Sequence, residues 1–267
     1  MNRFRLPCYL RLKRELGQID ACVECLEIAI REFVWQCANS ENVQAAIHGL
    51  SRKHGVRVDA VDVARFRCQS VGLQLIGVTQ AFETFLDSYL REHPRLGSRN
   101  GREDSETLLD FVIRRVGPAI KGKELKQGLD YRLYDYYRLL RNDLAHSGVE
   151  PEDIGRSASR RKTLDSLRVE CSASEEYEAL KAPNGASDVS FDDYVLFSRV
   201  AKRVARALGG LGQLSDEEIL HWLRRNQARQ GTVTRQRNAM VTLLRITFGM
   251  TPGEAGPFAD KIISEER

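Results

Sequence analysis

The residues with the clearest potential for chemistry are Arg141 and His146, with Asn142 between them. An imidazole titrates near neutral pH, so it can take up and release a proton during a reaction. A guanidinium stays charged and presents a planar fork that matches phosphate oxygens. Asn142 precedes His146 by one helical turn, where its amide can orient the imidazole or hold a phosphate oxygen. These residue types at this spacing favour proton transfer beside a bound phosphate group.

The segment that carries these residues predicts a helix over 131–147, opened by Asp130 and followed by Gly148 in the place of a glycine cap. A helical wheel gives it a narrow core stripe of Leu133, Tyr137, Leu140 and Leu144. Roughly opposite lie Asp135, Arg138, Asn142 and His146. Arg138 is the predicted substrate-binding residue on that second face.

The string Arg141-Asn-Asp-Leu-Ala-His146 resembles the Arg-x(4–6)-His signature of the HEPN superfamily of helical ribonucleases. Residues 74–90, which contain Phe-Glu-Thr-Phe-Leu, are similar to the first long helix of that family. The resemblance covers roughly residues 60–210. It implies an all-α core and a site shared by two chains, and it points to toxins or antiviral-defence effectors with an antitoxin or defence-system partner.

An RNA substrate suits this set of residues, because RNA carries its own nucleophile in the ribose 2′-hydroxyl. We expect Arg141 to bind the scissile phosphate and His146 to transfer the proton, with no metal or other cofactor. The products would be a 2′,3′-cyclic phosphate and a 5′-hydroxyl. Because one histidine cannot be acid and base at once, a two-fold homodimer that supplies two histidines and two arginines is expected.

A structural interpretation stays open beside this one. A histidine in the last turn of a helix can stabilise it by about 0.3–1 kcal/mol through the helix dipole, and Arg141 can pair with Asp143. The chain would then be a non-catalytic HEPN-like interaction or nucleic-acid-binding module.

The rest of the chain also predicts helices, because its apolar residues recur at spacings of three and four. The expected fold is all-α, an antiparallel helical bundle divided into an N-terminal extension (1–57), a HEPN-like core (58–212) and a C-terminal bundle (213–267). Helices are expected over 7–37, 43–52, 59–93 with Asp59 as its cap, 105–116, 151–171, 188–208, 219–230 and 233–248, with a last one from Thr251. Residues 121–128 are expected to be a basic connector or a single turn of helix.

The composition is that of an ordinary globular protein. The 267 residues include 41 Lys and Arg against 37 Asp and Glu, a formal charge of +4, and 42% are hydrophobic. This balance excludes disordered and collagen-like classes. No apolar run approaches the roughly 20 residues that cross a bilayer, and no apolar stretch follows the basic N-terminus. A cytoplasmic protein without a membrane partner is therefore expected.

Two further features leave alternatives open. The six cysteines are expected to be reduced, half-buried core residues, although Cys22-x-x-Cys25 has the spacing of half a zinc or redox motif. Residues 224–245 carry basic side chains with no acidic residue between them, namely Arg224, Arg225, Arg229, Arg235, Arg237 and Arg245. This stretch is either a solvated face or a surface for a phosphate backbone.

Overall fold

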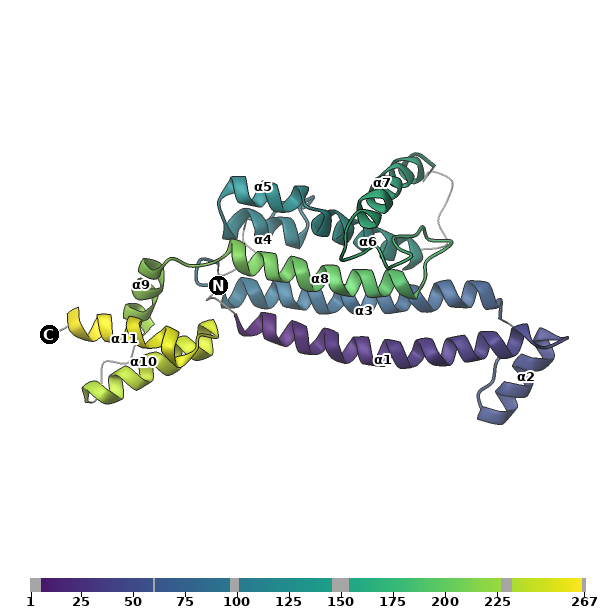
Figure 1. Cartoon of the computed structure of the whole chain (residues 1–267), viewed down its shortest axis with the longest axis horizontal. Coiled ribbons are helices and arrows are strands. Elements are labelled where there is room, and N and C mark those ends of the chain that lie inside the picture. Colours follow the sequence, from purple (N-terminus) through teal and green to yellow (C-terminus); the bar gives the residue numbers. More distant parts are fainter. Residues whose placement is uncertain (1–5, 60, 97–100, 146–153, 227–231, 266–267) are drawn as a thin grey trace. The chain divides into compact units, whose positions relative to one another are not determined.

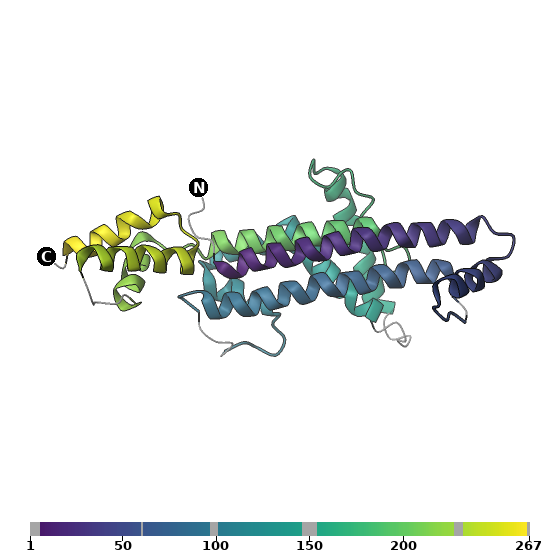
Figure 2. The ribbon, with the colours of Figure 1, turned by 90° about the horizontal axis from the view of Figure 1, so that it is seen from below.

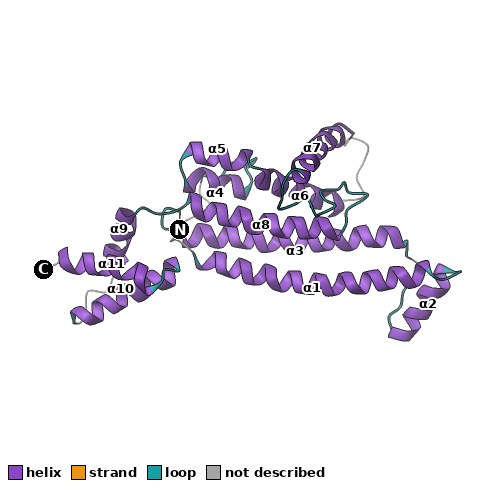
Figure 3. Ribbon diagram, viewed as in Figure 1, coloured by secondary structure: helices purple, strands orange, loops and turns teal. Residues whose placement is uncertain are grey.

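The structure is a computed structural model that describes residues 6–59, 61–96, 101–145, 154–226 and 232–265. All regular elements within these ranges are helices, which confirms the all-α class (Figure 3). They are α1 (Pro7–Ala38), α2 (Val43–His54), α3 (Val63–Glu92), α4 (Leu108–Val116), α5 (Ala119–Gln127), α6 (Leu129–Ala145), α7 (Ile154–Ser172), α8 (Phe191–Leu211), α9 (Asp216–Asn226), α10 (Val233–Phe248) and α11 (Pro252–Glu265).

Most predicted helices are present, with differences at their starts. Asp59 does not cap α3; Asp62 does, because its Oδ1 accepts a hydrogen bond from the amide of Arg65 at 3.1 Å. Thr107 caps α4 in the same way, through the amide of Asp110 at 3.1 Å. The predicted connector over 121–128 is a nine-residue helix, α5. Its Lys126 pairs with Asp110 of α4 at 2.5 Å, a contact that the basic composition alone did not reveal.

The helices form two compact units, each assembled from segments that are distant in the sequence. Unit 1 comprises Met1–Glu15, Ala81–Gly128 and Lys202–Arg267, and unit 2 comprises Leu16–Gln80 and Leu129–Ala201. The predicted division at residues 57 and 212 remains a prediction.

In unit 2, aromatic rings join α6 to α8. The rings of Tyr134 and Tyr137 lie 5.8 and 5.2 Å from that of Phe197, and all three side chains are buried. Figure 1 shows α7 beside α6, and Arg132 of α6 forms an ion pair with Glu170 of α7.

A buried carboxylate fixes the loop before α8 in the same unit. Asp193 is 0% exposed and accepts hydrogen bonds from the Tyr137 hydroxyl at 2.8 Å, the Asn184 amide at 2.7 Å and the Ser190 amide at 2.8 Å. Side chains of Asn184 and Ser190 add two more, at 2.9 and 3.1 Å. A buried charge needs such partners, so Asp193 holds α6, the loop and α8 together.

In unit 1, the C-terminal helices α9, α10 and α11 pack on one another. Figures 1 and 2 show α10 and α11 side by side, and α9 contacts α11. Their starts follow the sequence closely. Ser215 with Glu218, and Thr251 with Glu254, form reciprocal capping boxes in which each carboxylate accepts from the capping residue's amide at 2.8 Å. No helix in the described part of the chain is long and apolar enough to span a membrane.

Candidate functional site

Helix α6 holds the residues that the sequence singled out, and its core face is as predicted. Leu133 and Tyr137 are fully buried and Leu140 is 5% exposed. Leu144 is half-buried and lies close to Gly72 of α3, where an added Cβ would meet the Leu144 Cβ at 3.4 Å. Tyr134 and Tyr136 are buried as well, so the core face is broader than the predicted stripe. The helix is therefore held rigidly on one side.

The charged residues on the other side of α6 are half-buried rather than exposed. Within residues 129–144 no side chain is in the fully exposed class. Arg138 donates from Nε and Nη2 to Oδ1 of Asp135, at 3.0 and 2.7 Å. A phosphate approaching Arg138 would have to compete with this carboxylate. Among the four predicted site residues, Arg138 is thus the one whose predicted role, substrate binding, is least favoured.

Arg141 and Asn142 lie near the C-terminal end of α6 and are half-buried. Arg141 follows Tyr137 by one turn and lies at the border of the core face, and Asn142 lies on the second face, on a helix that the buried Tyr137 and Leu140 anchor. His146, the predicted proton-transfer residue, lies outside the described residues. The structure brings Arg138, Arg141 and Asn142 onto one helix, and the prediction for His146 is not tested.

The cysteines fall into three groups by exposure, with Cys68 half-buried, which corrects the expectation of a mainly core role. Cys8, Cys37 and Cys171 are buried, but Cys22 and Cys25 are exposed on α1. Both cysteines lie on faces of α1 that point away from the buried Leu16 and Val23. The spacing of apolar residues in the sequence did not distinguish these faces from the buried one. Among the described residues, no group of three or more His, Cys, Asp or Glu side chains is placed to hold a metal ion.

The basic stretch near the C-terminus is partly neutralised by α11. Arg224 pairs with Glu265, and Arg237 pairs with Asp260 through hydrogen bonds of 2.6 and 3.0 Å. These partners follow the stretch in the sequence, so a search for acidic residues within it cannot find them. Two of its arginines therefore stabilise the packing of the C-terminal helices.

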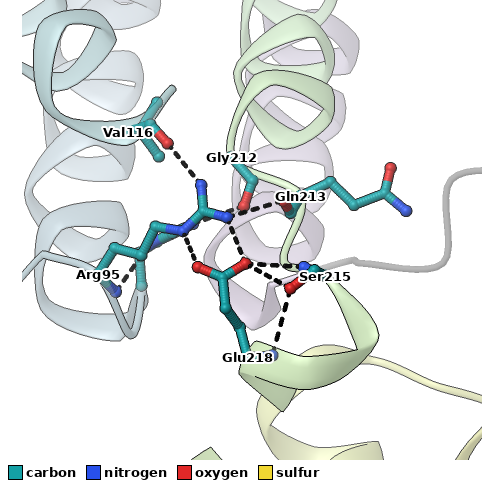
Figure 4. Close-up of polar contacts among 7 residues, drawn as sticks. Arg95, Val116, Gly212, Gln213, Ser215 and Glu218 are labelled. Carbon is teal, nitrogen blue, oxygen red and sulfur yellow. Dashed lines mark hydrogen bonds and ion pairs between the residues drawn. The ribbon is translucent and has the colours of Figure 1, made fainter. Parts of the chain in front are cut away.

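An unpredicted cluster lies in unit 1, where the end of α3 meets the end of α8 and the start of α9. Arg95 donates to both oxygens of Glu218, at 2.7 and 2.6 Å, and to the carbonyls of Val116 and Gln213, at 3.0 and 3.3 Å (Figure 4). Glu218 is also the acidic member of the Ser215 capping box. These hydrogen bonds lower the pKa of Glu218 to about 2, chiefly through Arg95.

A buried histidine completes this cluster. His93 is 1% exposed, and its Nδ1 accepts from the amide of Arg95 at 3.2 Å. The Nε2–H therefore donates to the Gly212 carbonyl, 2.8 Å away. Burial lowers the pKa of His93 to about 4 and outweighs the hydrogen bond to Gly212, so the ring is neutral near pH 7. In this junction His93 binds Gly212 and Arg95 binds Glu218, and each pair is more than a hundred positions apart in the sequence. Residue spacing therefore could not predict these contacts.

Beside the junction is a cavity of about 630 Å³. Arg95 and Glu218 form one wall, and the remaining lining comes mainly from α9, with Glu217, His221, Trp222 and Arg225. The Trp222 ring meets that of Phe248 edge-on, with centroids 4.7 Å apart, which fixes the orientation of the indole. The cavity combines an aromatic surface, a carboxylate and a guanidinium.

No family model, curated protein or solved structure matches this chain.

Proposed function

We propose that this protein is a metal-independent endoribonuclease that acts as a homodimer. Arg141 binds the scissile phosphate, His146 transfers the proton and Asn142 orients the imidazole. The ribose 2′-hydroxyl is the nucleophile, so the products are a 2′,3′-cyclic phosphate and a 5′-hydroxyl. The HEPN resemblance extends the proposal to a toxin or an antiviral-defence effector with an antitoxin or defence-system partner.

The observation that carries the proposal is the partial burial of Arg141 and Asn142 near the end of α6. Both are half-buried on a helix whose core face is anchored by Leu133 and Tyr137. A partly desolvated guanidinium binds a phosphate more strongly than one in bulk water, and a rigid helix keeps it in position. The spacing to His146, one turn further along the chain, supports a shared site.

One observation favours a second candidate, a non-catalytic interaction module. Arg138 already has a carboxylate partner in Asp135, as expected of a residue that stabilises its own helix. If Arg141 and His146 serve the same purpose, the chain binds partners or RNA without cutting it.

The test is RNA cleavage in the presence of a chelator by the wild type and by His146→Ala and Arg141→Ala. We expect each substitution to lower the cleavage rate by about 10²-fold or more, the usual contribution of a proton-transfer or charge-stabilising group. A substrate with a 2′-deoxy sugar at the cut position should not be cleaved. End-group analysis should find the cyclic phosphate.

Helix α2 offers control residues of the same types, because Arg52 and His54 lie in the last turn of α2 and are exposed. Arg52→Ala and His54→Ala should cleave at the wild-type rate. If the wild type cuts no RNA, or if the two α6 variants cut normally, the nuclease proposal is wrong and the interaction module is favoured.

A further inference from the structure

The cavity on α9 carries an inference that goes beyond the proposed function. Its residues belong to unit 1, whereas Arg141 and Asn142 belong to unit 2, and ligand binding there does not require catalysis. A volume of about 630 Å³ is in the usual range for a small-molecule site.

The chemical groups follow an order along α9. Glu217 lies in the first turn, Trp222 in the middle and Arg225 in the last turn. From Glu218 to Arg225 the helix rises by about 10 Å. Spacings of three and four residues place Glu218, Trp222 and Arg225 on one face of the helix, and Glu217 lines the same cavity from the adjacent side of the helix. The cavity therefore presents an acid at one end, an aromatic ring between and a cation at the other end.

The two charged ends are available to a ligand. Arg95 and Glu218 bind each other, so they form a neutral wall. Glu217 and Arg225 are exposed, and no side chain in the described part of the chain forms an ion pair with either. Trp222 is half-buried and lines the cavity, so part of its indole is open to a flat ligand.

We propose that this cavity binds a guanine nucleotide. The base stacks on Trp222, its Watson–Crick edge donates two N–H groups to the Glu217 carboxylate, and its phosphate meets Arg225. Stacking on an aromatic side chain suits any base. A carboxylate that accepts two parallel hydrogen bonds selects guanine, since uracil offers one such donor and adenine one amino group. The nucleotide can be free or part of a single-stranded RNA.

The intrinsic fluorescence of Trp222 tests the proposal, because the chain has only two tryptophans. In a Trp35→Phe background, GMP should quench the emission saturably and more strongly than AMP or UMP. Guanosine should bind more weakly than GMP. A short RNA with one guanosine, added to the His146→Ala variant so that it is not cut, distinguishes an RNA ligand from a free nucleotide by its relative affinity.

Two adjacent arginines provide a matched pair of variants. Arg225→Gln should weaken GMP binding by about tenfold or more and leave guanosine binding unchanged, because it removes a charge-assisted contact to phosphate. Arg224→Gln should leave both unchanged, since Arg224 is bound by Glu265 and does not line the cavity. Glu217→Gln should remove the preference for GMP over AMP.

Three results would overturn the inference. They are the absence of saturable quenching at millimolar GMP, equal competition by inorganic phosphate alone, and equal weakening by Arg224→Gln and Arg225→Gln. GMP has no internucleotide linkage to cut, and the RNA is added to a His146→Ala chain, so failure of binding is independent of whether the protein cleaves RNA.

Discussion

At the scale of single residues, His93 makes stability depend on pH. Its pKa is about 4 in the folded protein, against 6.5 in an unfolded chain. Below pH 6.5 the unfolded chain takes up a proton that the folded protein excludes, so stability falls as the pH decreases from 6.5 towards 4. Between pH 7 and pH 5 the loss should be about 2 kcal/mol. Glu218 contributes little there, because its stabilisation is lost only below its unfolded pKa of 4.5.

Urea unfolding of the wild type and His93→Gln at both pH values measures this effect. The variant should be less stable at pH 7, since the fit of the ring to Gly212 and Arg95 is lost. Its further decrease at pH 5 should be markedly smaller than that of the wild type. Equal decreases in the two proteins would mean that His93 is not the group responsible.

Gly212 is a second residue whose identity the packing dictates. A Cβ there would lie 2.7 Å from Cγ2 of Val116 and 2.8 Å from Nε2 of His93, and it would also overlap the Tyr89 hydroxyl. Gly212→Ala should therefore destabilise the fold by about 1–3 kcal/mol. Gly209 lies three residues earlier, inside α8, with no atom within 4 Å of an added Cβ. Gly209→Ala should stabilise by about 0.5–1 kcal/mol, and thermal melting compares the two.

At the scale of elements, comparing the two capping boxes distinguishes the stability that comes from helix capping from the stability that comes from the tertiary contact with Arg95. Glu218 and Glu254 cap their helices in the same way, but only Glu218 also binds Arg95. Glutamine is accepted in a capping box, so Glu254→Gln should cost a few tenths of a kcal/mol. Glu218→Gln should cost about 1 kcal/mol more, a value kept small because both partners are partly exposed. Equal denaturation midpoints would show that the Arg95 contact contributes nothing measurable.

The same contrast explains how much of the fold could be predicted. Capping boxes are local, and the expected start at Thr251 agrees with α11, whereas the helix expected over 219–230 begins three residues after the observed start of α9 at Asp216. The cap of α3 was misplaced because both Asp59 and Asp62 are suitable residues and only the tertiary structure selects between them. The sequence did not predict that Cys22 is exposed, because cysteine is usually buried. In addition, a helical wheel of a helix this long does not decide which of its faces are exposed.

The candidate site could be predicted only in part. The α6 stripe follows from spacing alone, and so does the adjacency of Arg141 and Asn142. The engagement of Arg138 by Asp135 is one of several pairs that a helix permits at this spacing. The cavity beside Arg95 depends on residues that are more than a hundred positions apart, and no periodicity in the sequence records such a contact.

At the scale of the whole molecule, the proposed homodimer makes a quantitative prediction for mixed subunits. If each active site needs histidines from two chains, wild-type protein unfolded and refolded with an equal amount of His146→Ala forms about one quarter wild-type dimers. RNA cleavage per total protein should then be about one quarter of the wild-type value. About one half is expected if each chain acts alone, and that result would contradict a shared site.

The five hydrogen bonds that Asp193 accepts have a consequence for backbone mobility. Asn184 and Ser190 belong to a segment without regular secondary structure, between α7 and α8, yet their amides are bonded to a carboxylate that solvent does not reach. Deuterium should replace these two amide hydrogens as slowly as those inside the neighbouring helices. This segment without regular secondary structure is thus expected to be as rigid as the helices around it.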